Sequence, residues 1–166
     1  KSRWPRAVGQ WALDSGGFTE IAMHGRWMTP PEQYALEACE WQERIGGLTF
    51  AAPQDWMCEP FMLVKTGKSI QEHQELTVTS YLRLRELAPA VPWIPVLQGW
   101  QYEDYLSHAL MWASAGVSLE TCTLVGLGSV CRRQATRLVT ELARELQGQC
   151  IRLHGFGFKV DGLART

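Results

Sequence analysis

Most signals of a specialised protein class are missing from this sequence. Its 16 Lys and Arg residues face 17 Asp and Glu, a formal charge of −1, which excludes a histone-like polybasic binder. No apolar run approaches the roughly 18 residues of a membrane span. The five cysteines form no CxxC pair, so neither a disulfide framework nor a metal site is indicated. Because nothing at the N-terminus resembles a signal peptide, we expect a cytoplasmic protein without metal, cofactor or membrane contact.

The length and composition that remain fit one folded domain over residues 1–166. Hydrophobic residues make up 46% of the 166 positions and charged residues 20%, which is typical of a globular chain. The first residue is Lys1 rather than Met. We therefore expect this domain to be processed, or to be part of something longer.

Short apolar runs alternate with longer amphipathic ones along the chain. The short runs have strand length and end in turn residues; they cover 11–13, 48–52, 93–97, 122–125 and 150–153. The helical patterns begin near Pro30, after Ser69, at Gln101 and at Ser129. Strands that alternate with helices predict an α/β fold with parallel strands.

Polar or small residues follow each predicted strand: Asp14, Asp55, Gln98, Gly126 and His154. Because the carboxyl ends of parallel strands share one face, we expect a site there. A dinucleotide fold would carry GxGxxG after its first strand, whereas this chain has DSGG there. A (β/α) barrel of the TIM type suits the pattern better, but about five βα units make it incomplete.

Individual motifs leave a structural and a functional interpretation open. The segment 14–18, DSGGF, is either a strand-ending turn or a ligand site with Asp14 as acid/base and Phe18 as a stacking face. Asp55 suits the paired N1–H and 2-amino donors of a guanine-like ring, and Gln98 can read a ring carbonyl. We expect His24, His73 and His108 on loops or helix surfaces, and Cys58 and Cys131 as buried apolar residues.

These motifs, in this order, resemble the tRNA-guanine transglycosylase superfamily. The strings WALDSGGFTE at 11–20, APQDWMCEP at 52–60, VLQG at 96–99 and LHGFGF at 153–158 are most similar to its DpdA-type branch. That branch places 7-deazaguanine bases in DNA, and the resemblance covers nearly the whole chain. It implies an incomplete (β/α)-barrel pentosyltransferase that exchanges guanine in DNA for a preQ0-type base without a cofactor.

The resemblance also implies roles for individual residues. Asp14 would be the general acid/base, Phe18 and His154 would lie on the two faces of the base, and Asp55 would accept from N1–H and the 2-amino group. Gln98 would bond the 6-oxo edge, with Gly126 and Leu127 near the 7-substituent. The complete set of base-binding positions is Ser15, Gly16, Gly17, Phe18, Asp55, Gln98, Gly99, Gly126, Leu127, His154 and Gly155.

Two departures from that family keep other functions open. The family's nucleophile is an Asp after a further strand, and Asp161 comes too early to take its place; the family's zinc site has no counterpart. A non-catalytic deazaguanine- or nucleic-acid-binding protein therefore remains an alternative, as does the same exchange on tRNA. A glycoside hydrolase that uses Asp14 and Asp55 is a fourth hypothesis. A local basic surplus after residue 129 suggests nucleic-acid contacts by Arg132, Arg133 and Arg137.

Overall fold

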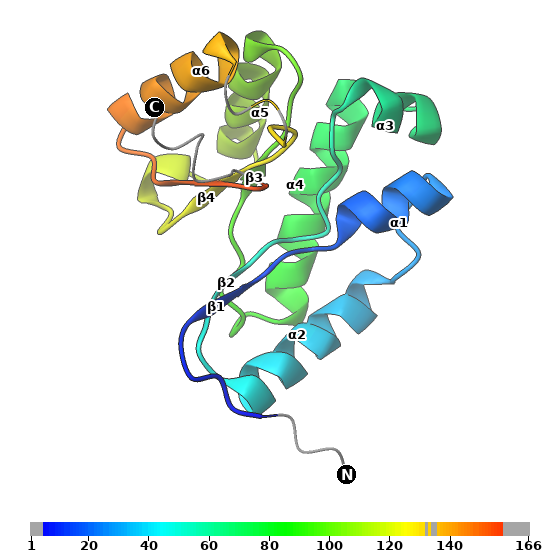
Figure 1. Cartoon of the computed structure of the whole chain (residues 1–166), viewed down its shortest axis with the longest axis vertical. Coiled ribbons are helices and arrows are strands. Elements are labelled where there is room, and N and C mark those ends of the chain that lie inside the picture. Colours follow the sequence, from blue (N-terminus) through cyan, green and yellow to red (C-terminus); the bar gives the residue numbers. More distant parts are fainter. Residues whose placement is uncertain (1–4, 132, 134–135, 158–166) are drawn as a thin grey trace.

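The computed structural model describes residues 5–131, 133 and 136–157, and shows parallel strands flanked by helices (Figure 1). The elements follow in the order β1 (Trp11–Leu13), α1 (Gly17–His24), α2 (Pro31–Ile45), β2 (Leu48–Ala51), α3 (Pro60–Thr66), α4 (Ile70–Leu87), β3 (Val96–Leu97), α5 (Tyr102–Ser114), the 3₁₀ turn η1 (Leu119–Thr121), β4 (Val125–Leu127), α6 (Arg137–Gly148) and β5 (Leu153–Gly155). The alternating α/β pattern predicted from the sequence is confirmed.

All the strands of the described residues run parallel, in two small sheets. β1 pairs with β2, and β3, β4 and β5 form the second sheet in that order. A bridge between Ala51 and Trp93 connects them, with Ala51 N donating to Pro92 O at 3.0 Å and Ile94 N donating to Ala51 O at 3.0 Å. The strands therefore follow one another in chain order, and the residues described here form no closed barrel.

Two strand predictions were shifted along the chain. The apolar runs at 122–125 and 150–153 placed those strands two or three residues too early, since β4 spans Val125–Leu127 and β5 spans Leu153–Gly155. Cys122 instead caps the 3₁₀ turn, and Cys150 adopts a left-handed backbone with φ 64°. Gly126 lies inside β4, and a larger residue does not fit there, because a Cβ would lie 2.6 Å from Phe156 Cε2. Gly126 and His154 are thus strand residues rather than residues that follow strands.

The helix predictions were correct for the long helices and missed the short ones. α2, α4 and α5 begin within a residue or two of the predicted starts, but α6 begins at Arg137 rather than at Ser129. Ser129 has a φ of 54°, which no helix accommodates. α1 and α3 were not predicted, because both are under nine residues and α1 begins inside the glycine pair.

The core is divided into a large and a small hydrophobic cluster. The large one joins the sheets to α2, α4, α5 and α6, and its fully buried members include Leu84, Tyr105 and Trp112. The small one consists of Ile21, Trp56, Met57 and Met62. It packs α1 and α3 around the chain that follows β2, and so supports the segment that carries Asp55.

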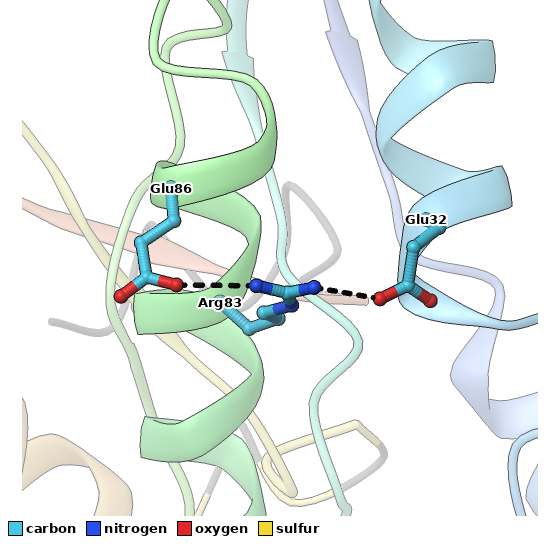
Figure 2. Close-up of polar contacts among 3 residues, drawn as sticks. All are labelled: Glu32, Arg83 and Glu86. Carbon is cyan, nitrogen blue, oxygen red and sulfur yellow. Dashed lines mark hydrogen bonds and ion pairs between the residues drawn. The ribbon is translucent and has the colours of Figure 1, made fainter.

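α2 and α4 lie side by side and are also linked by charges on their surface (Figure 1). Figure 2 shows Arg83 of α4 between Glu32 of α2, at 3.0 Å, and Glu86 of its own helix, at 3.3 Å. All three side chains are about half exposed or more, so solvent screens the attraction between them. No helix of the described residues is long and apolar enough to span a bilayer.

We predict that the start of α4 contributes more stability than this surface network. Ser69 Oγ accepts from Glu72 N at 3.2 Å, and Glu72 Oε2 accepts from Ser69 N at 2.7 Å, which forms a capping box. Ser69→Ala should lower the free energy of unfolding by about 1 kcal/mol. Arg83→Ala should leave it nearly unchanged in the same urea titration. A larger loss for Arg83→Ala than for Ser69→Ala would contradict this ranking.

Candidate functional site

The segment from Ala52 to Glu59 is fully buried although it forms neither helix nor strand. Buried backbone groups need hydrogen-bond partners, and here side chains from elsewhere in the fold provide them. Thr77 Oγ1 and His73 Nδ1 of α4 bond its backbone at 2.9 and 2.6 Å, and Ser129 Oγ accepts from a third backbone group at 2.7 Å. The segment is therefore held rigidly and presents its side chains at fixed positions.

Asp55 lies at the centre of this arrangement and accepts from two side chains. Ser15 Oγ donates to Oδ1 at 2.7 Å, and Gln98 Nε2 donates to Oδ2 at 2.5 Å. Burial raises the pKa of Asp55 to about 6, and the like charge of Asp14 adds to the rise, while the two hydrogen bonds oppose it. Asp55 follows β2, and these two bonds connect it to the segments that follow β1 and β3. Its carboxyl group is ionised above about pH 6.

Gln98 is fully buried and is held through its backbone as well as its side chain. Its N–H donates to His108 Nδ1 at 2.9 Å, and its carbonyl oxygen accepts from Gln74 Nε2 at 2.7 Å. Burial lowers the pKa of His108 to about 4, so its ring is neutral at pH 7. The expectation that His73 and His108 lie on the surface was wrong, because both are fully buried and position the site.

A cavity of about 240 Å³ opens beside Asp55 at the strand ends. Seven of the residues predicted for the site line it together: Asp14, Ser15, Gly16, Gly17, Phe18, Asp55 and Gln98. Asp14 is exposed, and the Phe18 ring is 52% exposed, so both are open to an incoming molecule. A carboxylate, an amide and an exposed aromatic ring around one small cavity suit a flat, polar-edged ring.

Other predicted positions lie near the cavity without lining it. Gly126 and Leu127 belong to β4, and His154 and Gly155 belong to β5. The His154 ring contacts two aromatic rings at steep angles, with centroid distances of 4.8 Å to Phe50 and 4.9 Å to Phe156. Burial lowers the pKa of His154.

Gly99 has a packing role that the sequence did not indicate, since a Cβ there would lie 2.9 Å from Asp104 Cβ.

Sequence reasoning missed several residues that line the cavity: Thr19, Met57, Glu59, Gly128, Ser129, Cys131, Phe156 and Gly157. Glu59 and Ser129 matter most, because they continue the hydrogen bonds from Gln98. Glu59 could have been found from its place in the same Pro-bounded loop as Asp55, but no sequence signal marked Ser129. Cys58 is buried as expected, whereas Cys131 is exposed, contrary to the expectation.

The predicted nucleic-acid contacts have partners within the fold. The Arg133 guanidinium lies 3.8 Å from the centroid of the Trp100 ring and donates to Trp100 O at 2.8 Å. Arg137 is exposed and pairs with Glu141 at 2.7 Å. Arg132 lies outside the described residues. Contact between these arginines and nucleic acid remains a prediction.

Comparison with models of protein families identifies the family of the chain. A model of the family DpdA, DeoxyPurine in DNA protein A, matches residues 1–166. The chain belongs to the DpdA family. This family is involved in 7-deazaguanine modification of DNA, as the sequence motifs suggested. Comparisons with curated proteins and with solved structures find no match.

The cavity of this DpdA-family protein brings three carboxyl groups together, those of Asp14, Asp55 and Glu59. Among residues 5–131, 133 and 136–157, no three His, Cys, Asp or Glu side chains lie where they could hold one ion. The two acceptor oxygens of Asp55 face neutral donors instead. Such an arrangement suits recognition of hydrogen-bond donors on an organic ring.

We predict that Asp55 makes the stability of this protein depend on pH. Its folded pKa of about 6 exceeds an unfolded value of about 3.9, so its stabilising contribution is complete below about pH 4 and is lost as the pH rises through 6. Asp55→Asn removes this dependence. The stability of Asp55→Asn relative to wild type should therefore increase by roughly 3 kcal/mol between pH 4 and pH 7. Urea unfolding at several pH values measures it.

The exposed Glu103 provides the control for this measurement. Glu103→Gln removes a carboxyl group on the surface and leaves the site intact, so it shows how much of any change comes from Asp55 itself. A pH-independent difference between Asp55→Asn and wild type would show that Asp55 titrates normally.

We predict that Gly128 is required to leave space for the Gln98 amide. A Cβ at Gly128 would lie 2.6 Å from Gln98 Cδ, well inside van der Waals contact. Gly128→Ala should displace the amide and cost about 1–3 kcal/mol of stability. Gly148→Ala is the matched control, because nothing lies within 4 Å of its Cβ position at the end of α6. Thermal unfolding of both variants should show destabilisation for Gly128→Ala only.

Proposed function

We propose that this protein exchanges guanine in DNA for a 7-deazaguanine base of the preQ0 type. The observation that carries the proposal is the buried Asp55 acceptor, which lies in one cavity with Asp14, Phe18 and Gln98. Membership of the DpdA family supports DNA as the polynucleotide. We also infer that the five parallel strands belong to an incomplete barrel of the TIM type.

The proposed roles follow from donor and acceptor types. Guanine and preQ0-type bases both present N1–H and a 2-amino group side by side, and an ionised Asp55 accepts from both. Gln98 Nε2 has a second hydrogen beyond the one given to Asp55, and it would donate this hydrogen to the 6-oxo group. Phe18 would cover one face of the ring. The opposite face is proposed for His154, beside the Phe156 ring.

The reaction balances without a cofactor. The bond between N9 of guanine and C1′ of its sugar breaks, and a bond between N9 of the incoming base and the same C1′ forms. The departing guanine gains a proton at N9, and the incoming base loses one. We assign this proton transfer to Asp14, which is exposed at the end of β1 and lines the cavity.

Such an exchange requires the target base to leave the duplex. Enzymes that act on a base extrude it into a pocket and pay for the lost stacking with new contacts. The 52% exposed ring of Phe18 packs edge-on against Phe61, with 5.9 Å between centroids, and Phe61 is equally exposed. These two rings provide an apolar surface at the mouth of the cavity, to which an extruded base can stack.

The test is incorporation of labelled guanine or preQ0 into duplex DNA by the full-length protein, with tRNA in a parallel reaction. We predict incorporation into DNA. Asp14→Asn should lower the rate at least about a hundredfold while base binding persists. Asp55→Asn should lose base binding itself, because a donor replaces part of the acceptor. Glu103→Gln should match wild type.

The other outcomes separate the alternatives. Incorporation into tRNA alone would show that the protein carries out the same exchange on tRNA and not on DNA. Base binding without incorporation into either polymer would support a non-catalytic binding protein. If neither guanine nor preQ0 bound, the proposed site would be wrong.

A further inference from the structure

A hydrogen-bonded chain of side chains crosses the site from Glu59 to Asp55. Glu59 Oε2 lies 3.1 Å from Ser129 Oγ, Ser129 Oγ lies 2.7 Å from Gln98 Oε1, and Gln98 Nε2 lies 2.5 Å from Asp55 Oδ2. All four residues are at least nine-tenths buried. The chain therefore joins two buried carboxyl groups through one hydroxyl and one amide.

The Ser129 hydroxyl has too few hydrogens for its neighbours. Cys58 N donates to Ser129 Oγ at 2.7 Å, and two oxygens, Glu59 Oε2 and Gln98 Oε1, lie within bonding distance of it. A hydroxyl carries a single hydrogen, so it cannot donate to both oxygens at once. A second hydrogen is needed, and Glu59 can supply it only when its carboxyl group is protonated.

The orientation of the Gln98 amide indicates the same location for the proton. Its N–H₂ faces Asp55 and its carbonyl faces Ser129, which suits an ionised Asp55 and a donating Ser129. Ser15 also donates to Asp55, at 2.7 Å. A proton on Asp55 instead would require the amide to be reversed, with its carbonyl toward Asp55.

The surroundings of Glu59 favour its neutral form. No Lys, Arg or His of the described residues lies within 4.0 Å of its carboxylate. Burial raises the pKa of Glu59; its own backbone N–H, the Ser129 hydrogen bond and the charge of Arg133 partly offset this. The Arg133 guanidinium is directed to the carbonyls of Trp100 and Ser129. The other titratable groups facing this cluster are Asp14, Asp55, Cys58, Asp104 and Tyr105.

The backbone of Ser129 carries a further sign of a specialised role. Its φ of 54° lies in the left-handed region, which is unusual for a residue other than glycine, asparagine or aspartate. Residues held in such conformations cluster at functional sites. At Ser129 this conformation accompanies a hydroxyl within reach of Glu59, Gln98 and the Cys58 amide together.

We propose that Glu59 holds a proton and, through Ser129, fixes the Gln98 amide with its N–H₂ toward the ligand, so that the site selects bases with a 6-oxo group. Glu59 and Ser129 are positioning residues that act through Gln98. The inference rests on the proposed function, because it concerns the edge of the base that Gln98 would read. Glu59 and Ser129 keep the Gln98 amide in one orientation, whereas a free amide can present either its N–H₂ or its carbonyl group.

The first experiment locates the proton without any ligand. Infrared difference spectra at pH 7 compare the full protein with Glu59→Gln, Asp55→Asn and Glu103→Gln. We predict a carbonyl band of a protonated carboxyl group that disappears in Glu59→Gln alone. Absence of that band from wild type, or its loss in Asp55→Asn alone, would overturn the proposal.

The second experiment measures dissociation constants for guanine and 6-thioguanine by calorimetry. The two share N1–H and the 2-amino group, and sulfur at position 6 is the weaker acceptor. Glu59→Gln should bind guanine within about twofold of wild type, since its amide donates to Ser129 as the protonated carboxyl does. Ser129→Ala should weaken guanine binding about tenfold and bring the ratio of the two constants toward one.

The outcomes distinguish this inference from the proposed function. If wild type bound neither guanine nor preQ0, the proposed function would fail, while the infrared result would still report where the proton lies. If wild type bound guanine and Ser129→Ala kept the full preference over 6-thioguanine, the inference alone would be overturned. A tenfold loss in Glu59→Gln would likewise overturn it, because it would show that the negative charge is required. Circular dichroism of each variant confirms that it folds.

Discussion

The site depends on a buried carboxylate that is satisfied by neutral donors rather than by a cation. Asp55 accepts from Ser15 after β1 and from Gln98 after β3, and is itself carried by the chain after β2. These bonds tie together segments that are 40 and 43 positions apart in the sequence. Since a buried charge without partners is costly, any shift of one segment raises the energy of the others. Each carboxylate oxygen of Asp55 accepts one of these two bonds, so Asp55 can accept further hydrogen bonds from a ligand.

Rigidity around Asp55 comes from side chains of neighbouring helices, because its own loop forms neither helix nor strand. Thr77 and His73 of α4 satisfy the loop backbone, and His108 of α5 binds the backbone of Gln98. Neutral histidines suit this task, since each ring nitrogen can be a donor or an acceptor without adding charge beside a carboxylate. Positions fixed before a ligand arrives are what recognition of a flat polar ring requires. This arrangement is consistent with membership of a DNA-modifying family.

Prediction from the sequence worked where a signal was local. Asp14, Asp55 and Gln98 follow short apolar runs, and all three line the cavity. It failed where the outcome depended on distant residues. His108 was expected on a helix surface, because its burial against Gln98 depends on how α5 packs. The ends of β4 and β5 were misplaced because left-handed Cys150 and the 3₁₀ turn before β4 leave no mark in the apolar pattern.

The order of the apolar and amphipathic runs by itself determined a parallel α/β fold and the strand-end location of its polar residues, since these follow from short-range periodicity and turn chemistry. Only the tertiary structure decided which of those residues meet. It placed His154 against Phe50 and Phe156, and it brought Glu59 and Ser129, 70 positions apart, into one hydrogen-bonded chain. The reason is physical: a buried polar atom takes whichever partner the packing of remote segments leaves within about 3 Å, and no local pattern encodes that choice.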